Sequence, residues 1–168
     1  GLIALSACLR GDVPTAFLQY GYDAALSKAK EYADIFGKEN YFLEIQNHGL
    51  SEEKEVRDAL LKISQQTGIE LVATNDVHYV LPEDAMLPDT DRMKMEGDQF
   101  CFKSGEEMEA IFADYPNAIC NTKKIADMCN LTIDTKTLHL PSISINSSLS
   151  HEEYLYNLCA EGMKQKYN

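Results

Sequence analysis

Side chains that bind metal ions stand at the ends of two apolar runs in this sequence. Asp76 and His78 lie two positions apart in the run VATNDVHYV (72–80), and Cys8 closes the run LIALSAC (2–8). Because side chains alternate along a β-strand, Asp76 and His78 are expected to point to the same side. A thiolate, a carboxylate and an imidazole together suit zinc or manganese, and such an ion makes a bound water nucleophilic near neutral pH. These three residues are therefore the candidate metal ligands.

Three further polar residues stand near the same apolar runs. Arg10 follows Cys8, while Glu44 and His48 lie at the end of the run YFLEIQ (41–46). We interpret Glu44 and His48 as supporting residues around the ligands, and Arg10 as a group that could meet a phosphate. Alternatives stay open, because Glu44 could face a helix, His48 could cap a turn and Arg10 could form a surface salt bridge. An isolated Asp-x-His pair is a weak motif, so the metal hypothesis depends on a fold that brings these segments together.

The apolar spacing predicts such a fold. Short β-rich runs alternate with stretches in which apolar residues recur every three or four positions, in the order strand, helix, strand, helix, strand. The connections are long enough for parallel pairing, and parallel α/β sheets gather their functional groups at the carboxyl ends of the strands. The expected strands are 2–8, 41–46 and 70–76, and the expected helices run from Pro14 to Gly37 and from Ser51 to Gly68.

The second half of the chain carries two patterns that typically begin helices. Ser104 is followed by Glu107, and Ser150 by Glu153, which is the spacing of a capping box. In that arrangement the serine oxygen and the glutamate carboxylate each accept a backbone N–H at the start of the helix. We therefore predict helices that begin at Ser104 and Ser150.

Between these helices we predict a further helix at 116–130 and then an extended connector. The connector, TLHLPSISINSSLS (137–150), is rich in Ser and contains a Pro, which is typical of a domain boundary. The residues of the 116–130 helix that are expected to face inward are Ile119, Ile125 and Met128. We divide the chain into an α/β domain at 1–140, with a helical appendage at 98–134, and a connector with a C-terminal helix at 141–168.

Composition excludes several functional classes. The net charge of −12 disfavours unaided binding to nucleic acid, because an acidic surface repels the phosphate backbone. Hydrophobic residues make up 45% of the chain, but no apolar run is long enough to cross a bilayer, so we expect no membrane association. The five cysteines show no Cys-x-x-Cys spacing, which argues against a zinc ribbon or a disulfide framework. A reducing, cytoplasmic setting is expected.

A longer set of blocks resembles a known family over nearly the whole chain, in order. The blocks are LSACLRGDVP, YFLEIQNHGL, GIELVATNDVHYVLPEDA, GDQFCFKSGEEMEAIF, NTKKIADMCNLTI, LHLPSISI and HEEYLYNLCAEGMKQKY. They resemble the bacterial replicative DNA polymerase III alpha subunits, from the second half of the N-terminal PHP (polymerase and histidinol phosphatase) domain to the first helix of the palm. The resemblance implies part of a distorted β/α barrel with parallel strands and outer helices, followed by a C-terminal helical segment.

The same resemblance implies a function for the candidate ligands. Cys8, Asp76 and His78 match ligands of a cluster of up to three metal ions, zinc or manganese, which in some members hydrolyses DNA from 3′ to 5′. The family's early His-x-His motif, its other ligands and its palm carboxylates have no counterpart in these 168 residues. We therefore expect no complete catalytic site and no activity in this fragment alone. The complete subunit is expected to use magnesium for polymerisation and to bind DNA and other replicase subunits.

Two other functions remain open at this stage. The chain could belong to a non-catalytic PHP scaffold that supports the polymerase core or docks a proofreading subunit. It could also be a stand-alone PHP phosphoesterase that acts on a small phosphate monoester, although the sequence holds only four histidines from which to build a cluster.

Overall fold

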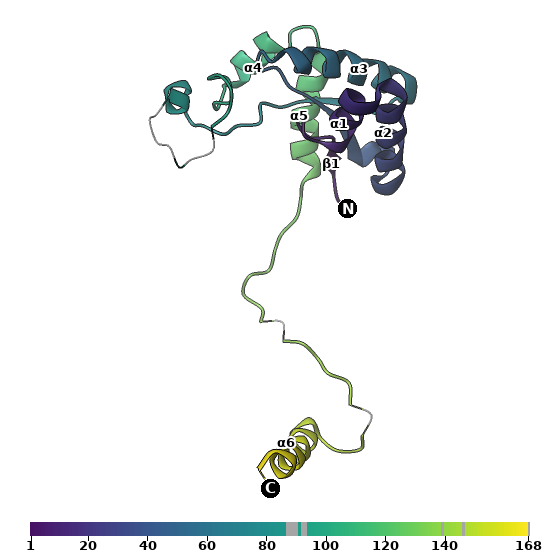
Figure 1. Ribbon diagram of the computed structural model, residues 1–168, viewed down its shortest axis with the longest axis vertical. Coiled ribbons are helices and arrows are strands. Elements are labelled where there is room, and N and C mark those ends of the chain that lie inside the picture. Colours follow the sequence, from purple (N-terminus) through teal and green to yellow (C-terminus); the bar gives the residue numbers. More distant parts are fainter. Residues whose placement is uncertain (87–90, 92–93, 139, 146, 168) are drawn as a thin grey trace. The chain divides into compact units, whose positions relative to one another are not determined.

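The computed structural model describes residues 1–86, 91, 94–138, 140–145 and 147–167. The chain divides into two compact units, Gly1–Asn130 and Leu131–Asn168 (Figure 1). The first unit is built on a parallel sheet in the order β1–β2–β3, formed by Ala4–Leu5, Tyr41–Ile45 and Leu71–Ala73. The predicted parallel α/β arrangement is confirmed. The described residues form an open sheet of three strands, and no closed barrel is present in this part of the chain.

The outer strands are shorter than predicted, because the chain turns soon after each of them. Beyond β1, the hydroxyl oxygen of Ser6 accepts the Glu44 N–H at 2.8 Å, and Ala7 adopts a left-handed conformation with φ of 63°. Beyond β3, the Thr74 N–H still donates to the Ile45 carbonyl at 3.1 Å, and Asp76 then adopts φ of 40°. Each left-handed residue ends the extended backbone that a longer strand would need.

The helices of the first half lie where the spacing predicts them, with one division. The stretch between Pro14 and Gly37 forms two helices that are separated by Gly21, whose φ of 85° is in the left-handed region. Gly68 ends the next helix in a left-handed conformation, as expected for a glycine at this position. These elements are α1 (Asp12–Tyr20), α2 (Tyr22–Phe36), the 3₁₀ turn η1 (Lys38–Asn40) and α3 (Ser51–Thr67).

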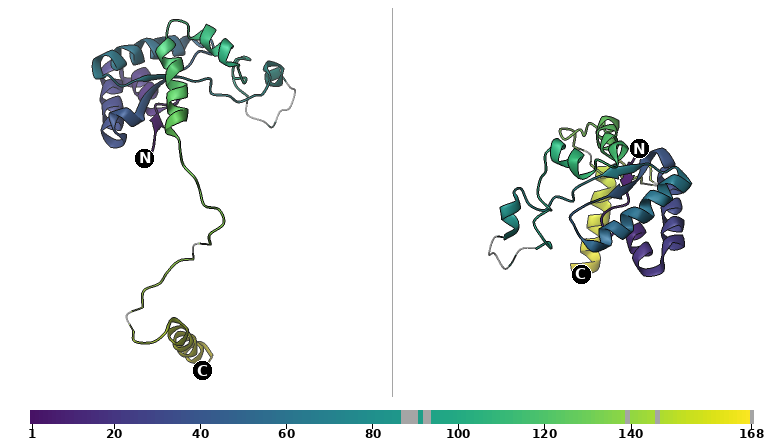
Figure 2. Two further views of the ribbon diagram at one scale, coloured as in Figure 1. Left: turned by 180° about the vertical axis from the view of Figure 1, so that it is seen from behind. Right: turned by 90° about the horizontal axis from the view of Figure 1, so that it is seen from above.

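The core lies between the sheet and helices α1, α2 and α3. Figure 2 shows these three helices grouped together, with α5 (Pro116–Met128) alongside the sheet. The central strand β2 is buried except at Glu44, which is half-buried. The rings of Tyr32 and Phe36 stand 5.7 and 6.4 Å from the ring of Tyr41, centre to centre, so α2 packs on β2 through aromatic contacts.

Helix α5 covers the outer edge of β3. The amide of Asn121 donates to the Leu71 carbonyl at 2.8 Å, and the hydroxyl of Thr122 donates to the Ala73 carbonyl at 3.1 Å. An uncovered edge strand would expose these carbonyls to solvent or to another chain. The segment predicted as an appendage therefore completes the hydrogen bonding of the sheet, and it lies within the first compact unit up to Asn130.

The inward face predicted for α5 is only partly right. Ala118 and Asn121 are its buried residues, Ile119 packs partly against the core, and Met128 is exposed. The reason is that the helix lies against a strand edge, which needs hydrogen-bond donors as well as apolar area.

The capping box at Ser104 is confirmed. The preceding short elements are the 3₁₀ helix η2 (Pro82–Met86) and α4 (Gly105–Ile111).

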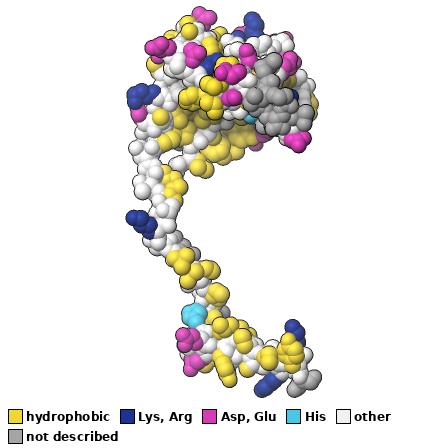
Figure 3. Space-filling model, turned by 90° about the vertical axis from the view of Figure 1, so that its left-hand side faces the viewer, with side chains coloured by type: hydrophobic (Ala, Val, Ile, Leu, Met, Phe, Trp, Pro, Cys, Tyr) yellow, Lys and Arg dark blue, Asp and Glu magenta, His cyan; other side chains and the backbone are white. Residues whose placement is uncertain are grey.

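The second unit contains one helix, α6 (His151–Tyr167), among its described residues. Its capping box is confirmed, because Ser150 and Glu153 exchange hydrogen bonds at 2.9 and 3.2 Å. Apolar side chains are exposed along the connector and on α6 (Figure 3). In the described part of the chain, no helix combines the length and the apolar character that a membrane span requires. The division into domains at residue 140 stays a prediction.

Candidate metal centre

Cys8 lies in a tight turn that joins β1 to α1. Its carbonyl accepts the Gly11 N–H at 2.8 Å, so the chain reverses within four residues. A side chain at Gly11 would place its Cβ 2.1 Å from the carbonyl oxygen of Ser6. Glycine is therefore required at this position by close approach of the backbone, and its φ of −66° would suit any residue. The turn leaves the Cys8 side chain half-buried beyond the carboxyl end of β1.

Asp76 and His78 lie together beyond the carboxyl end of β3. Nε2 of His78 is 3.4 Å from Oδ1 of Asp76, and the two side chains are 27% and 30% exposed. The alternation of a strand does not produce this contact, because β3 ends at Ala73 and Asp76 is in the left-handed region. Non-glycine residues in such conformations are held by their surroundings and occur often at functional sites.

The separation of these two side chains is compatible with one shared cation. Two ligands that each stand roughly 2.1 Å from a zinc ion at the tetrahedral angle are about 3.4 Å apart. A direct hydrogen bond between the same atoms would normally be shorter, at about 2.7–3.2 Å. Among the described residues, however, no group of three or more His, Cys, Asp or Glu side chains converges closely enough to hold a metal. The Asp76–His78 pair is thus the best-formed part of the candidate centre.

Cys8 opens onto the same cavity as this pair. The cavity has a volume of about 460 Å³ and is lined by all three predicted ligands. The thiol and the Asp76–His78 pair are therefore on one side of the molecule, as the parallel sheet predicts. Two cationic side chains, Arg10 and Lys94, also line it. Arg10 is exposed, which suits a residue that would meet a ligand from solvent.

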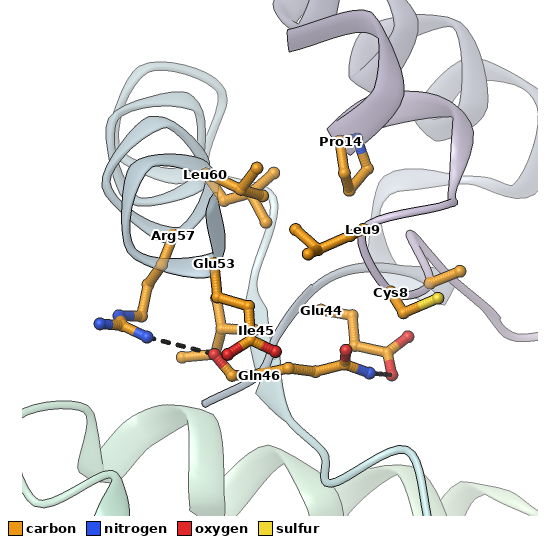
Figure 4. Close-up of a pocket in the computed structure, with 11 residues that line it drawn as sticks. Cys8, Leu9, Pro14, Glu44, Ile45, Gln46, Glu53, Arg57 and Leu60 are labelled. Carbon is orange, nitrogen blue, oxygen red and sulfur yellow. Dashed lines mark hydrogen bonds between the residues drawn. The ribbon is translucent and has the colours of Figure 1, made fainter. Parts of the chain in front are cut away.

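Glu44 points toward the Cys8 side of the sheet. Its carboxylate accepts hydrogen bonds from the Gln46 amide, at 3.2 Å, and from the Thr74 hydroxyl. Figure 4 shows Cys8, Glu44 and Gln46 at one end of a narrow crevice between β2, α1 and α3. The crevice has a volume of about 10 Å³, which is barely enough for one water molecule. Glu44 is thus oriented by its neighbours beside Cys8.

His48 is buried and both of its ring nitrogens are engaged. Nδ1 lies 2.5 Å from a carboxylate oxygen of Glu53, and Nε2 lies 2.8 Å from the carbonyl oxygen of Asn75. Both ring nitrogens of His48 are therefore occupied by protein groups, and neither is open to a metal ion. Nε2 instead holds the peptide that joins Asn75 to Asp76.

Glu53 is a buried carboxylate that the sequence analysis missed. Burial favours its neutral form, but hydrogen bonds from the side chain and backbone N–H of His48 outweigh burial and lower the pKa of Glu53 below its ordinary value. Its position in the first turn of α3 indicated only that a negative charge there would stabilise the start of the helix. The presence of a histidine five residues earlier was the one signal that could have indicated the pair.

Phe100 was also missed. Its ring stacks on the His48 ring with centres 3.8 Å apart and an angle of 8°, and it meets the His78 ring edge-on at 5.8 Å. It is 3% exposed and lines the cavity. The sequence offers no periodic pattern around Phe100 that would have shown this role.

Comparisons with known proteins agree with the resemblance seen in the sequence. Residues 1–48 match the family described as PHP domain. The chain is 38% identical to the DNA polymerase III subunit alpha of Treponema pallidum over 99% of its length, which corresponds to 16% of that protein. It is 36% identical to the subunit of the same name from Thermus aquaticus, over 99% of this chain and 15% of that protein. For Helicobacter pylori strain 26695, the identity is 38%, over 81% of this chain and 13% of the relative. The chain thus spans about a sixth or less of the length of these relatives.

Proposed function

This chain belongs to the family of bacterial DNA polymerase III alpha subunits, and we propose that Cys8, Asp76 and His78 supply part of a divalent-metal site in its PHP domain. In this proposal the complete subunit uses the site to hydrolyse phosphodiester bonds from the 3′ end of DNA. The subunit would act in replication in the cytoplasm, with DNA and other replicase subunits as partners and with magnesium at a separate polymerisation site.

One observation carries the proposal: three metal-competent side chains from two strand ends line one cavity, and two of them are 3.4 Å apart. Thiolate, carboxylate and imidazole are the ligands that zinc prefers, and carboxylate and imidazole also suit manganese. A bound divalent ion would supply a water that is nucleophilic near neutral pH.

The residues of the chain itself have distinct roles in this proposal. Cys8, Asp76 and His78 would hold the ion, and Glu44 would orient the side chains near Cys8. Arg10, which is exposed at the cavity, would bind a phosphate oxygen of the substrate. The described residues supply fewer ligands than a cluster of several ions needs, so other segments of the subunit must contribute the rest.

The test is a comparison of two double variants in the complete subunit. Asp76→Ala with His78→Ala removes the proposed ligands, whereas Asp127→Ala with His151→Ala removes the same residue types at exposed positions. We expect the first variant to lose metal-dependent 3′ to 5′ nuclease activity while polymerisation is retained, and the second to keep both. Equal nuclease activity in the two variants would refute the ligand role.

The role of Cys8 has its own test. Cobalt bound to a thiolate shows a ligand-to-metal charge-transfer band, and Cys8→Ser should abolish that band in the cobalt-loaded subunit. A band that persists in Cys8→Ser would exclude Cys8 as a ligand.

A non-catalytic scaffold is the second candidate. It is favoured by the lack, among the described residues, of any converging group of three ligands. For a scaffold, the purified subunit would contain no stoichiometric metal, and the Asp76→Ala, His78→Ala variant would match the wild type in every metal-dependent assay. Stoichiometric metal that is lost in this variant would exclude the scaffold.

A further inference from the structure

The buried pair formed by His48 and Glu53 supplies no ligand to the proposed metal site, and its contacts suggest a different role. A buried ion pair is costly unless its hydrogen bonds are complete. This pair is complete: the Glu53 carboxylate accepts from Nδ1 and the backbone N–H of His48, at 2.5 and 2.6 Å, and from the Leu50 N–H at 3.3 Å. The His48 ring is therefore held in one orientation.

In that orientation the His48 ring contacts the backbone next to Asp76, one of the candidate ligands. Nε2 of His48 donates to the Asn75 carbonyl at 2.8 Å, and this carbonyl belongs to the peptide that enters Asp76. Asp76 has φ of 40°, a conformation that requires its surroundings to hold it. The hydrogen bond fixes the peptide on which that conformation depends.

The His48 ring is also linked to the candidate ligand His78, because Phe100 contacts both rings. The ring of Phe100 lies flat on His48 and edge-on to His78. The backbone repeats the link, because the His78 N–H donates to the Phe100 carbonyl at 2.8 Å. The Asn75 amide donates to the carbonyls of Gln99 and Cys101, at 3.1 and 2.6 Å, and so holds the residues on both sides of Phe100.

We propose that His48, oriented by Glu53, is a positioning residue that sets the geometry of Asp76 and His78 through the Asn75 carbonyl and the Phe100 ring. This inference rests on the proposed metal site, because it concerns how the ligands of that site are held before an ion binds. In this proposal His48 acts through the Asn75 carbonyl and the Phe100 ring and is not itself a ligand.

Two substitutions of His48 separate positioning from general stability. In His48→Asn the amide nitrogen replaces Nδ1 and still donates to Glu53, but it cannot reach the Asn75 carbonyl. In His48→Gln the amide nitrogen replaces Nε2 and reaches that carbonyl, but the bond to Glu53 is lost. Each variant loses the ring and one side-chain hydrogen bond. Because His48→Gln loses the stronger bond, to the buried Glu53 carboxylate, a purely structural role predicts that His48→Gln is the more damaging variant, whereas positioning through the Asn75 carbonyl predicts the reverse.

The first measurement is metal affinity of the complete subunit, titrated with cobalt or zinc. Outer partners of a metal site typically change affinity about 10- to 100-fold, so we expect a loss in that range for His48→Asn and a loss below about tenfold for His48→Gln. Equal losses in the two variants, with wild-type binding that depends on Asp76, would overturn the inference and leave the proposed function intact. Wild-type binding that is unchanged in Asp76→Ala would instead refute the proposed function.

The second measurement needs no metal. Hydrogen exchange of the metal-free subunit reports on the N–H of His78, which donates to Phe100. We expect His48→Asn to speed exchange in peptides that cover 76–80, relative to peptides from α2, and His48→Gln to change it less. Exchange that rises equally at both places, or equally in both variants, would overturn the positioning role even if no metal were bound.

Discussion

Replacing Glu53 by glutamine should strongly destabilise the fold, although the side chain keeps its size. The carboxylate of Glu53 is 4% exposed and accepts three N–H groups, two of them from His48. A glutamine amide has one acceptor oxygen, so it cannot accept the three N–H groups as the two carboxylate oxygens do. Glu53→Gln therefore removes the buried negative charge beside His48 and one of the two acceptor atoms.

The magnitude follows from the burial of the pair. Breaking a buried ion pair by removing one partner costs about 3–5 kcal/mol. That is a large part of a total stability of about 5–15 kcal/mol. With a urea slope of about 2 kcal/mol per molar, the unfolding midpoint should fall by about 1.5–2.5 M.

The assay is urea unfolding of the 168-residue chain, and Glu52→Gln is the matched control. Glu52 is the neighbouring residue in the first turn of α3, carries the same charge and is exposed. Its replacement changes the net charge equally but breaks no buried contact, so its midpoint should move much less. The two variants are compared by their free energies of unfolding. Values for Glu53→Gln and Glu52→Gln that agree within about 0.5 kcal/mol would refute the assignment of a buried ion pair.

Three further predictions concern acid stability, the Cys8 turn and the edge of the sheet. Because the folded pKa of Glu53 is lowered, its contribution is present above the unfolded pKa of about 4.3 and is lost as the pH falls through the folded value. Acid unfolding curves should therefore be steeper for the wild type than for Glu53→Gln, and parallel curves would contradict this. Gly11→Ala places a Cβ 2.1 Å from a backbone oxygen, so thermal unfolding should show a loss of about 1–3 kcal/mol from overpacking; an unchanged Tm would contradict this close approach. Asn121→Ala leaves the Leu71 carbonyl without its donor and should cost about 1–3 kcal/mol in urea unfolding, whereas Asn117→Ala, at an exposed position of α5, should have little effect; equal costs would contradict the edge contact.

Much of the fold follows from local patterns. The order of strands and helices, the helix ends at Gly37 and Gly68 and the capping boxes at Ser104 and Ser150 are all as predicted. These features depend on residues within a few positions of one another, so the local sequence is enough to predict them. The division of the first helix at Gly21 was missed, because a single glycine is tolerated in many helices.

The candidate site divides in the same way. Parallel strand order was enough to predict that Cys8 and the Asp76–His78 pair share one side of the sheet, and they line one cavity. Strand alternation predicted only that Asp76 and His78 point to the same side. They lie 3.4 Å apart, but β3 ends at Ala73 and Asp76 is left-handed, so the alternation of a strand does not account for their contact. The peptide that enters Asp76 accepts a hydrogen bond from His48, which lies 27 residues from Asn75 in the chain.

The amino-acid sequence by itself determined the kinds of side chain available for chemistry and the strand ends from which they project, because both depend on local composition and period. Only the tertiary structure decided that Glu53 would be a buried partner of His48, that Phe100 would lie between two histidines and that α5 would cover the edge of β3. Each of these contacts joins segments that are independent in the chain. Burial then makes every unpaired polar group costly, so the packed fold selects the partners that no local pattern specifies.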